Sequence, residues 1–255
     1  MTAAPFELES AANALVLGAG HGIGFAIAQR LIDTGEMTVF ATYRCAAKAT
    51  PLLELARESS RLLAIQADPC EELQIEALFE NIRGHTDSLD LVLNCVGVLH
   101  DGMVQPEKAV RSIDLDALMQ YFLVNAVLTP VLAKHAHPLL RGESPSVFAA
   151  ISARVGSISD NRLGGWYGYR ASKAAMNMFL RTLAIEFKAP RTNCVVLALH
   201  PGTTRTALSA PFIERTHYVV HTPYATAKHM LRVIAGKTID DTGSFYAWDG
   251  ERLEW

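Results

Sequence analysis

The chain has 255 residues, of which 50% are hydrophobic, and a formal net charge of −3. This length allows a large buried core in one domain or at most two. The balanced charge, without a long run of Lys or Arg, argues against a surface that binds nucleic acid or an anionic membrane. The N-terminal residues lack the basic and apolar segments of a signal peptide, and no run of about 18 apolar residues predicts a membrane-spanning helix.

Four cysteines are widely spaced along the chain: Cys45, Cys70, Cys95 and Cys194. They form no C-x-x-C pair, so neither a zinc site nor a disulfide framework is predicted. Three of them lie in or beside apolar runs, where a free cysteine behaves as a small core residue. We therefore expect a cytoplasmic protein that is kept reduced and holds no metal.

Apolar strand-like runs alternate with helical stretches in chain order. The predicted strands are 13–20, 37–43, 61–68, 89–97, 145–152, 193–202 and 243–248, and the predicted helices are 25–35, 50–60, 70–83, 114–137, 168–188 and 222–236. Strands that are apolar on both faces indicate a buried parallel sheet. The alternation predicts a single α/β domain of Rossmann type, residues 13–255, with a doubly wound parallel sheet of about seven strands and helices on both faces. Residues 1–12 are expected to be a disordered segment before it.

A glycine-rich stretch, Gly18-Ala19-Gly20-His21-Gly22-Ile23-Gly24, follows the first predicted strand and precedes the first predicted helix. Glycines in this position allow a tight turn and a close approach of the backbone to a pyrophosphate. The helix N-terminus then offers free N–H groups and partial positive charge. The stretch predicts a dinucleotide site that includes Gly18, Gly20, His21, Gly22, Ile23 and Gly24; a plain strand–helix turn is the alternative.

The second predicted strand ends "ATYR", with Arg44 where an acidic residue would mark NAD. An acid there binds the ribose 2′-hydroxyl, whereas an arginine suits a 2′-phosphate. The sequence therefore favours NADP over NAD as the cofactor. The alternative is that Arg44 is only a solvated loop residue.

Tyr169 and Lys173 stand four residues apart in a predicted helix, so their side chains share one face. A lysine ammonium beside a phenol favours the phenolate and makes the tyrosine a better acid–base group near neutral pH. The spacing alone is common by chance, so a solvated turn of helix remains the alternative for this pair.

Several motifs occur together in one order: the glycine turn, Asp68, Asn94-Cys95-Val96-Gly97, Asn125, Tyr169 with Lys173, and Pro201-Gly202. In this order and spacing the chain resembles the short-chain dehydrogenase/reductase family along essentially its whole length. The stretches "VFATYR", "ISARVGSI", "GGWYGYRASKAAMNM" and "TGSFYAWDGERLEW" are most similar to the C-factor/sniffer-like group of small carbonyl reductases.

The resemblance implies a role for each matching residue. Tyr169 would protonate the carbonyl oxygen, Lys173 would lower the pKa of Tyr169 and hold the nicotinamide ribose, and Asn125 would hold a water that reaches Lys173. Further cofactor contacts are implied for Asp68 and the adenine amino group, for Asn94 and Gly97 on the adenosine side, and for Pro201, Gly202, Thr204 and Thr206 at the nicotinamide end.

The serine that polarises the substrate in this family is the least secure match. Counting back three residues from Gly156 gives Ala153, and Ser152 is one residue earlier. Neighbours in a strand face opposite sides, so Ser152 would need a bulge to reach Tyr169. Ser152 is predicted as the hydroxyl donor, with Ser157 and Ser159 as other possible sources.

The sequence thus predicts an NADP(H)-dependent oxidoreductase that transfers a hydride between the nicotinamide and a small carbonyl or alcohol substrate. The alternative is an NADP-binding signalling or regulatory protein with little or no turnover. The resemblance also implies a homodimer or homotetramer. No nucleic-acid or membrane partner is expected.

Overall fold

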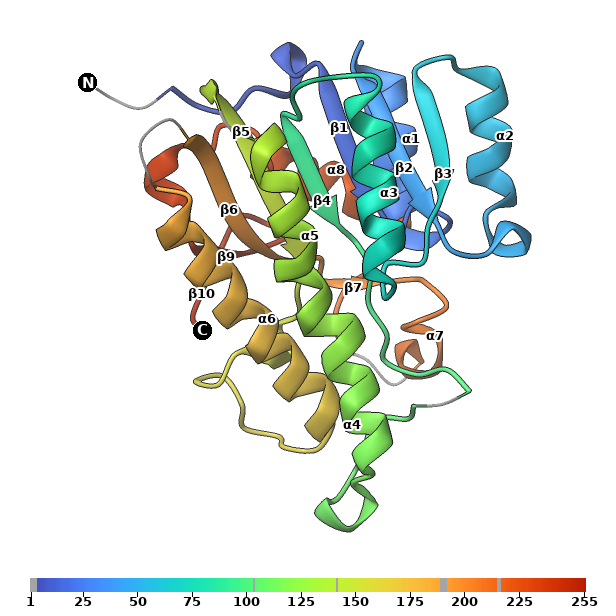
Figure 1. Ribbon diagram of the computed structural model, residues 1–255. Coiled ribbons are helices and arrows are strands. Elements are labelled where there is room, and N and C mark those ends of the chain that lie inside the picture. The colour runs from blue at the N-terminus through green and yellow to red at the C-terminus, as the bar shows by residue number, and fades with distance from the viewer. Residues whose placement is uncertain (1–3, 103, 141, 189–191, 215–216) are drawn as a thin grey trace.

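A twisted β-sheet runs through the centre of the computed structural model, which describes residues 4–102, 104–140, 142–188, 192–214 and 217–255 (Figure 1). From one edge to the other its strands are β10 (Arg252–Leu253), β9 (Ser244–Ala247), β6 (Thr192–His200), β5 (Gly142–Ile151), β4 (Leu91–Asn94), β1 (Asn13–Leu17), β2 (Thr38–Tyr43) and β3 (Leu62–Gln66). All neighbouring strands in this sheet are parallel except β9 and β10.

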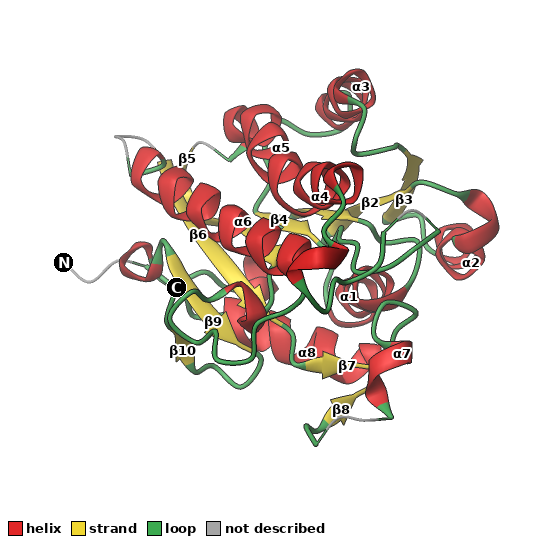
Figure 2. Ribbon diagram, turned by 90° about the horizontal axis from the view of Figure 1, so that it is seen from below, coloured by secondary structure: helices red, strands yellow, loops and turns green. Residues whose placement is uncertain are grey.

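Helices cover both faces of the sheet (Figure 2). One face carries α1 (Gly22–Thr34), α2 (Thr50–Glu58) and α8 (Pro223–Ile234), and the other carries α3 (Glu72–Arg83), α5 (Leu128–Ala136) and α6 (Tyr167–Glu186). α4 (Leu115–Phe122) lies beyond the strand ends and packs against α6. This arrangement confirms the predicted doubly wound α/β fold.

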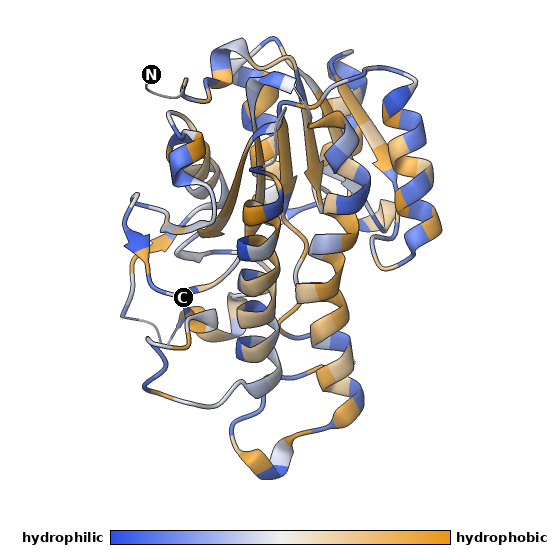
Figure 3. Cartoon of the chain, turned by 60° about the vertical axis from the view of Figure 1, so that its left-hand side comes forward, coloured by the Kyte–Doolittle hydropathy of each residue, from blue (hydrophilic) through white to orange (hydrophobic). Residues whose placement is uncertain are grey.

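Side chains of the central strands alternate between two hydrophobic cores. In β1, Ala14 and Val16 pack toward α1 and α8, whereas Leu15 and Leu17 pack toward α3, α5 and α6. All four are buried, and the strands are accordingly hydrophobic along most of their length (Figure 3). A sheet covered on both faces needs apolar side chains on both, which explains the continuous apolar runs in the sequence.

The strand order places the opening of the sheet between β1 and β4. The chain runs outward from β1 to β3 and then returns to β4 on the other side of β1, where Leu17 is in register with Asn94. The connections after these two strands leave in opposite directions, so a crevice forms beyond their carboxyl ends. The glycine turn and residues 95–98 lie at this crevice.

The predicted helices agree with four of the observed ones to within two residues at each end. The predicted helix 114–137 is instead α4 and α5 joined by a π-helical turn, Leu123–Val127. The apolar pattern continues through this turn, so the sequence did not reveal it. The short elements β7 (Thr203–Thr204), α7 (Ala210–Ile213) and β8 (Val220–His221) were also not predicted.

The N-terminal segment differs from the disorder expected for residues 1–12. Phe6 is only 1% exposed, and its backbone N–H and C=O pair with Lys237 and Gly236 at 2.8 Å each. Phe6 and Ala11 are buried in the same core, Leu8 packs against it, and together with these backbone bonds they offset the cost of ordering the segment. Residues 1–3 lie outside the described part of the chain.

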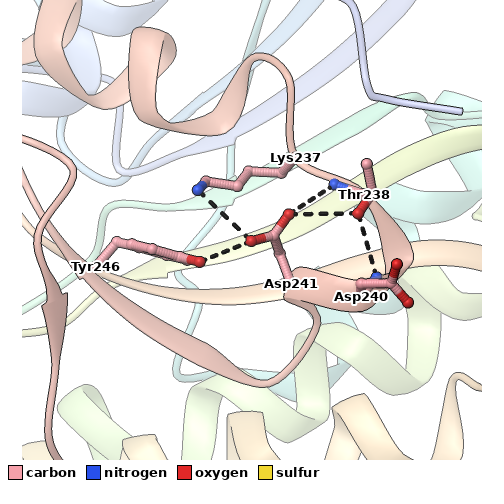
Figure 4. A network of polar contacts seen from close by, with 5 residues as sticks. All are labelled: Lys237, Thr238, Asp240, Asp241 and Tyr246. Atoms are coloured by element: carbon pink, nitrogen blue, oxygen red, sulfur yellow. Dashed lines mark hydrogen bonds and ion pairs between the residues drawn. The ribbon is translucent and has the colours of Figure 1, made fainter. Parts of the chain in front are cut away.

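A polar network holds the segment that Phe6 pairs with (Figure 4). The Asp241 carboxylate accepts hydrogen bonds from the Tyr246 hydroxyl at 2.7 Å and from the Thr238 backbone N–H at 3.0 Å. The Lys237 ammonium lies 3.6 Å from the same carboxylate. These contacts connect the turn after α8, with which the N-terminal segment pairs, to β9.

Replacing Phe6 with alanine tests whether this segment belongs to the core. We expect Phe6→Ala to lower the free energy of unfolding by about 3–5 kcal/mol, as for other buried phenylalanines. Leu73→Ala is the matched control, because Leu73 is 78% exposed and its truncation should change stability little. Denaturant unfolding measures both; equal stability of Phe6→Ala and the parent would show that the segment is frayed.

Candidate functional site

The glycine turn connects β1 to α1 in a tight loop at the crevice. Gly18 and Gly22 have φ values of +72° and +62°, a backbone region that favours glycine. A Cβ on Gly24 would lie 2.3 Å from the carbonyl oxygen of Gly18, so the turn closes on itself. His21, which precedes α1, makes no side-chain cap to it. The first N–H groups of α1 therefore face the end of the sheet, where an anionic phosphate can accept hydrogen bonds from them.

The other two residues of this turn that were predicted as cofactor contacts, Gly20 and Ile23, pack against the protein. A Cβ on Gly20 would lie 3.2 Å from the Cβ of Tyr43, so the turn passes close to β2. Ile23 is half-buried and packs against the core. Both residues therefore pack against the rest of the protein, and this packing fixes the shape of the turn.

Basic groups gather beside the glycine turn. Partial burial, and then the positive charges of Lys48 and Arg44, lower the pKa of His21. Arg44 follows β2, and Lys48 ends the short 3₁₀ helix Ala46–Lys48. Arg44 and His21 were predicted from the sequence but Lys48 was not, because a lysine five residues past the end of a strand carries no local signal. Arg44 and Lys48 thus form a positive patch suited to an anion, with the neutral imidazole of His21 beside them.

Asp68 and Asn94 are positioned by bonds within the protein. One carboxylate oxygen of Asp68 accepts from the Cys70 N–H at 3.0 Å. Asn94 is fully buried, donates to the Thr129 hydroxyl at 3.2 Å and accepts from the Val96 N–H at 3.0 Å. Both ends of the Asn94 amide are thus engaged inside the protein, where they tie β4 to α5 and shape the turn that leads to Gly97.

Asn125 lies in the middle of the π-helical turn and pairs with the backbone of Val98. Its amide donates to the Val98 carbonyl and accepts from the Val98 N–H, both at 2.8 Å. It also donates to the Ser172 hydroxyl on α6 at 3.2 Å. A Cβ on Gly97 would lie 3.4 Å from Asn125 Oδ1 and 3.5 Å from Lys173 Nζ, so the predicted residues Gly97, Asn125 and Lys173 converge.

Tyr169 and Lys173 lie one turn apart on α6 and are both buried, at 8% and 3% exposure. The Lys173 ammonium is 5.9 Å from the centroid of the Tyr169 ring. It donates a hydrogen bond of 2.9 Å to the carbonyl of Ile151, the last residue of β5. The end of β5 therefore fixes the lysine beside the tyrosine.

Burial determines the protonation of this pair. It raises the pKa of Tyr169 to about 12 and lowers the pKa of Lys173 to about 7, the latter against a smaller opposing effect of Cys95. The resemblance implied that Lys173 lowers the pKa of Tyr169, but in this structure the loss of hydration dominates. At neutral pH the phenol is therefore protonated and can act as an acid.

Ser152 is not brought to Tyr169. Its hydroxyl is buried and donates to Asn177 Oδ1 on α6 at 2.6 Å. Ala153, whose backbone is extended (φ −147°, ψ 142°), packs instead against the cluster that contains Tyr169. No bulge re-aims the strand end, so the alternation of side chains turns Ser152 away. Ser157 and Ser159 were the other predicted sources of a hydroxyl, and their hydroxyl groups contact each other at 3.2 Å.

Residues after β6 form another wall of the crevice. Pro201 is buried, and Gly202 has a φ of +69°. A Cβ on Gly202 would lie 2.7 Å from Trp248, so only glycine fits. The Thr204 hydroxyl contacts that of Thr226 on α8 at 2.8 Å and is thereby engaged inside the protein.

Thr206 reaches the glycine turn from this wall. Its methyl group would lie 3.6 Å from a Cβ on Gly22. Its hydroxyl is 3.3 Å from that of Ser209, which also accepts from the Thr206 N–H at 3.0 Å. Thr206 is therefore placed where a group bound on the glycine turn can be contacted from the opposite side.

The surroundings of Tyr169 are apolar. The centroid of the Trp166 ring lies 6.1 Å from that of the Tyr169 ring and 5.0 Å from that of the Phe212 ring. Val155 and Leu208 pack against the same cluster. The position of Trp166 depends on an unusual backbone turn before α6, in which its own φ is +52°.

A possible metal cluster lies on α3 and α5, apart from the residues above. Ligand atoms of Glu72, Glu76 and His135 lie within 4.8 Å of one another. Glu72 already pairs with the Lys134 ammonium at 2.7 Å. We assign no metal to these residues, and the expectation that the protein holds none stays a prediction.

Comparison with known proteins gives a consistent result. Residues 12–217 match the family described as short chain dehydrogenase. A relative, the 1-hydroxy-2-glutathionyl-2-methyl-3-butene dehydrogenase of Rhodococcus sp. (strain AD45), is 30% identical over 243 residues, which are 94% of this chain and 98% of that protein.

Solved structures also resemble this one. The NADPH-bound carbonyl reductase from chicken fatty liver has a TM-score of 0.84 at 25% identity over 96% of this chain and 99% of its own. The carbonyl reductase Sniffer of D. melanogaster has the same TM-score and coverage at 22% identity and shows the same fold. These matches confirm the predicted family: the chain belongs to the short-chain dehydrogenase family of oxidoreductases.

Proposed function

We propose that this chain is an NADP(H)-dependent reductase of small carbonyl compounds, in which Tyr169 is the general acid. The observation that carries the proposal is the buried pair of Tyr169 and Lys173, which keeps a protonated phenol at the open end of the sheet. The NADPH-bound state of the chicken carbonyl reductase supports the choice of cofactor.

The residues present fit NADP. Glycine at positions 18 and 24 lets the turn close tightly before α1, since Cβ atoms there would lie 3.1 Å from the Val96 side chain and 2.3 Å from the Gly18 carbonyl oxygen. The N-terminus of α1 suits the pyrophosphate. The positive patch of Arg44 and Lys48, next to His21, suits a 2′-phosphate. We assign Gly97 and Thr206 to the walls on either side.

The chain's own groups account for the proton. When bound, NADPH supplies the hydride that a carbonyl carbon accepts. Tyr169 donates its phenolic proton to the carbonyl oxygen, which would otherwise become an alkoxide. Lys173 titrates near neutral pH and can return a proton toward Tyr169. Asn125 holds the backbone of Val98, in the loop after β4, and Gly97 of the same loop lies beside Lys173.

The apolar surroundings of Tyr169 favour a substrate with a hydrophobic body. Ala153, Trp166 and Phe212 offer hydrocarbon and aromatic surface but no hydroxyl. Tyr169 is therefore the donor that we assign to the carbonyl oxygen. Removing one oxyanion donor from an enzyme costs roughly 10²-fold or more in turnover, so we expect modest rates with simple ketones.

We also propose a homodimer formed by α4 and α6. These helices pack against each other, and their outer faces carry exposed apolar side chains. Leu115 is 71% exposed, Met119 64%, Met178 66% and Ile185 64%. By length and composition alone Leu115–Leu139 could cross a membrane, but its other face holds the buried Tyr121 and Asn125. A second copy would cover the exposed face.

We also propose a cytoplasmic location. The free thiols among the described residues agree with it, because thiols stay reduced there.

Replacing Tyr169 tests the proposed function. We expect Tyr169→Phe to lower the rate of NADPH oxidation with a small carbonyl panel by about 10²–10⁴-fold, because it removes only the proton donor. NADPH binding, followed by nicotinamide fluorescence, should change little. Tyr167→Phe is the control, since Tyr167 is 41% exposed on the same turn. Parental turnover in Tyr169→Phe would refute the assignment.

A second prediction concerns the choice between NADPH and NADH. Replacing both Arg44 and Lys48 with alanine should weaken NADPH binding by roughly 10–100-fold, because hydrogen bonds to charged groups contribute about 1.5–3 kcal/mol. NADH lacks the 2′-phosphate and should be affected much less. Arg57→Ala, on the exposed face of α2, is the control. An equal loss for both cofactors would contradict the proposed phosphate site.

A further inference from the structure

Glu107 is a buried carboxylate that the proposed mechanism does not use. It is 4% exposed and lies in the long connection between β4 and α4. Both of its carboxylate oxygens lie 3.2 Å from the backbone N–H of Gly168, in the first turn of α6. Burying a carboxylate is costly unless its partners compensate, so its position calls for a physical reason.

The way in which the chain enters α6 supplies that reason. Gly164, Gly165 and Trp166 all have positive φ values, of 63°, 65° and 52°. Trp166, the residue before the helix, makes no side-chain cap to it. The first N–H groups of this 20-residue helix therefore need an acceptor from elsewhere in the chain. Glu107 provides one, and its negative charge also suits the positive end of the helix dipole.

Further contacts bind the two segments together. The Trp166 N–H donates to the backbone carbonyl of Glu107. A Cβ on Gly168 would lie 2.3 Å from the Tyr121 ring and 3.0 Å from Glu107 Oε1, so only glycine allows this approach. The Tyr121 ring is in turn 6.4 Å from that of Tyr169. Glu107, Gly168 and Tyr121 thus enclose the start of α6 immediately before Tyr169.

We propose that Glu107 is a positioning residue, which fixes the first turn of α6 and thereby holds the Tyr169 hydroxyl where the substrate carbonyl arrives. Its relevance to catalysis rests on the proposed reductase function. It does not exchange a proton with the substrate. A misplacement of about 1 Å at a reacting group can cost 10²-fold in rate, so a cap one residue away from Tyr169 matters for turnover as well as for stability.

Glu107→Ala, Glu107→Gln and Asp114→Ala test this proposal. Asp114 is the matched control, because its carboxylate caps α4 by accepting from the Ala117 N–H at 2.9 Å. We expect Glu107→Ala to lower kcat by about 100-fold with little change in the affinity for NADPH. Glu107→Gln keeps a carbonyl oxygen for the Gly168 N–H and should recover most of kcat. Asp114→Ala should lose stability without a matching loss of kcat.

Hydrogen exchange in residues 167–173 provides a readout that does not require turnover. Glu107→Ala should exchange faster there than the parent, and Asp114→Ala should not. Unchanged exchange, or a loss of kcat that Gln does not rescue, would overturn the positioning role. A parent protein that reduces no carbonyl would refute the proposed function instead, while the exchange measurement would still decide whether Glu107 orders α6.

Discussion

The burial of a lysine beside a tyrosine is the constraint on which the site depends. Lys173 is nearly inaccessible to water and donates to the Ile151 carbonyl at 2.9 Å. In such surroundings the charged forms of both side chains are penalised, so the phenol keeps its proton and the ammonium loses its own near neutral pH. Small residues make this possible: a Cβ on Gly156 would lie 2.8 Å from that of Lys173, and Gly97 approaches from the crevice side.

The strand order creates the crevice in which this buried pair lies. Because the strand order reverses between the parallel strands β1 and β4, the glycine turn and the residues after β4 open toward the same crevice. Polar and positive groups gather on the side of β2, whereas aromatic and aliphatic side chains surround Tyr169. The division separates an end suited to phosphates from an end suited to an apolar substrate. α6 carries both Tyr169 and Lys173, and Lys173 connects this helix to the end of β5 through its hydrogen bond to the Ile151 carbonyl.

Much of this could be predicted from the sequence. Continuous apolar runs between helical stretches predicted the covered parallel sheet, and the glycine spacing predicted the turn before α1. Tyr169, Lys173, Asn125 and Gly97 were predicted through the family resemblance, and the structure brings them together. The helix ends were also close, because caps and breakers act locally.

What the sequence could not predict depends on direction and on distant contacts. Whether a bulge re-aims Ser152 could not be read from the sequence; without one, the alternation along β5 turns Ser152 toward Asn177 and leaves Ala153 facing the Tyr169 cluster. The π-helical turn around Asn125 is hidden in an unbroken apolar pattern. Glu107 meets α6 across 61 residues of sequence, and no local signal marks such a cap. Phe6 shows the same limit, because its partners lie near the other end of the chain.

The most direct test of this account is the ionisation of Tyr169 itself. The protein can be labelled with ¹³Cζ-tyrosine and followed by NMR as the pH is raised, with Tyr169→Phe used to assign the resonance. The account predicts that Tyr169 stays protonated well above pH ~10, where an exposed tyrosine is half ionised, because burial raises its pKa to about 12. Ionisation of Tyr169 at or below pH ~9 would show that the lysine, rather than burial, controls the phenol, and would contradict the account.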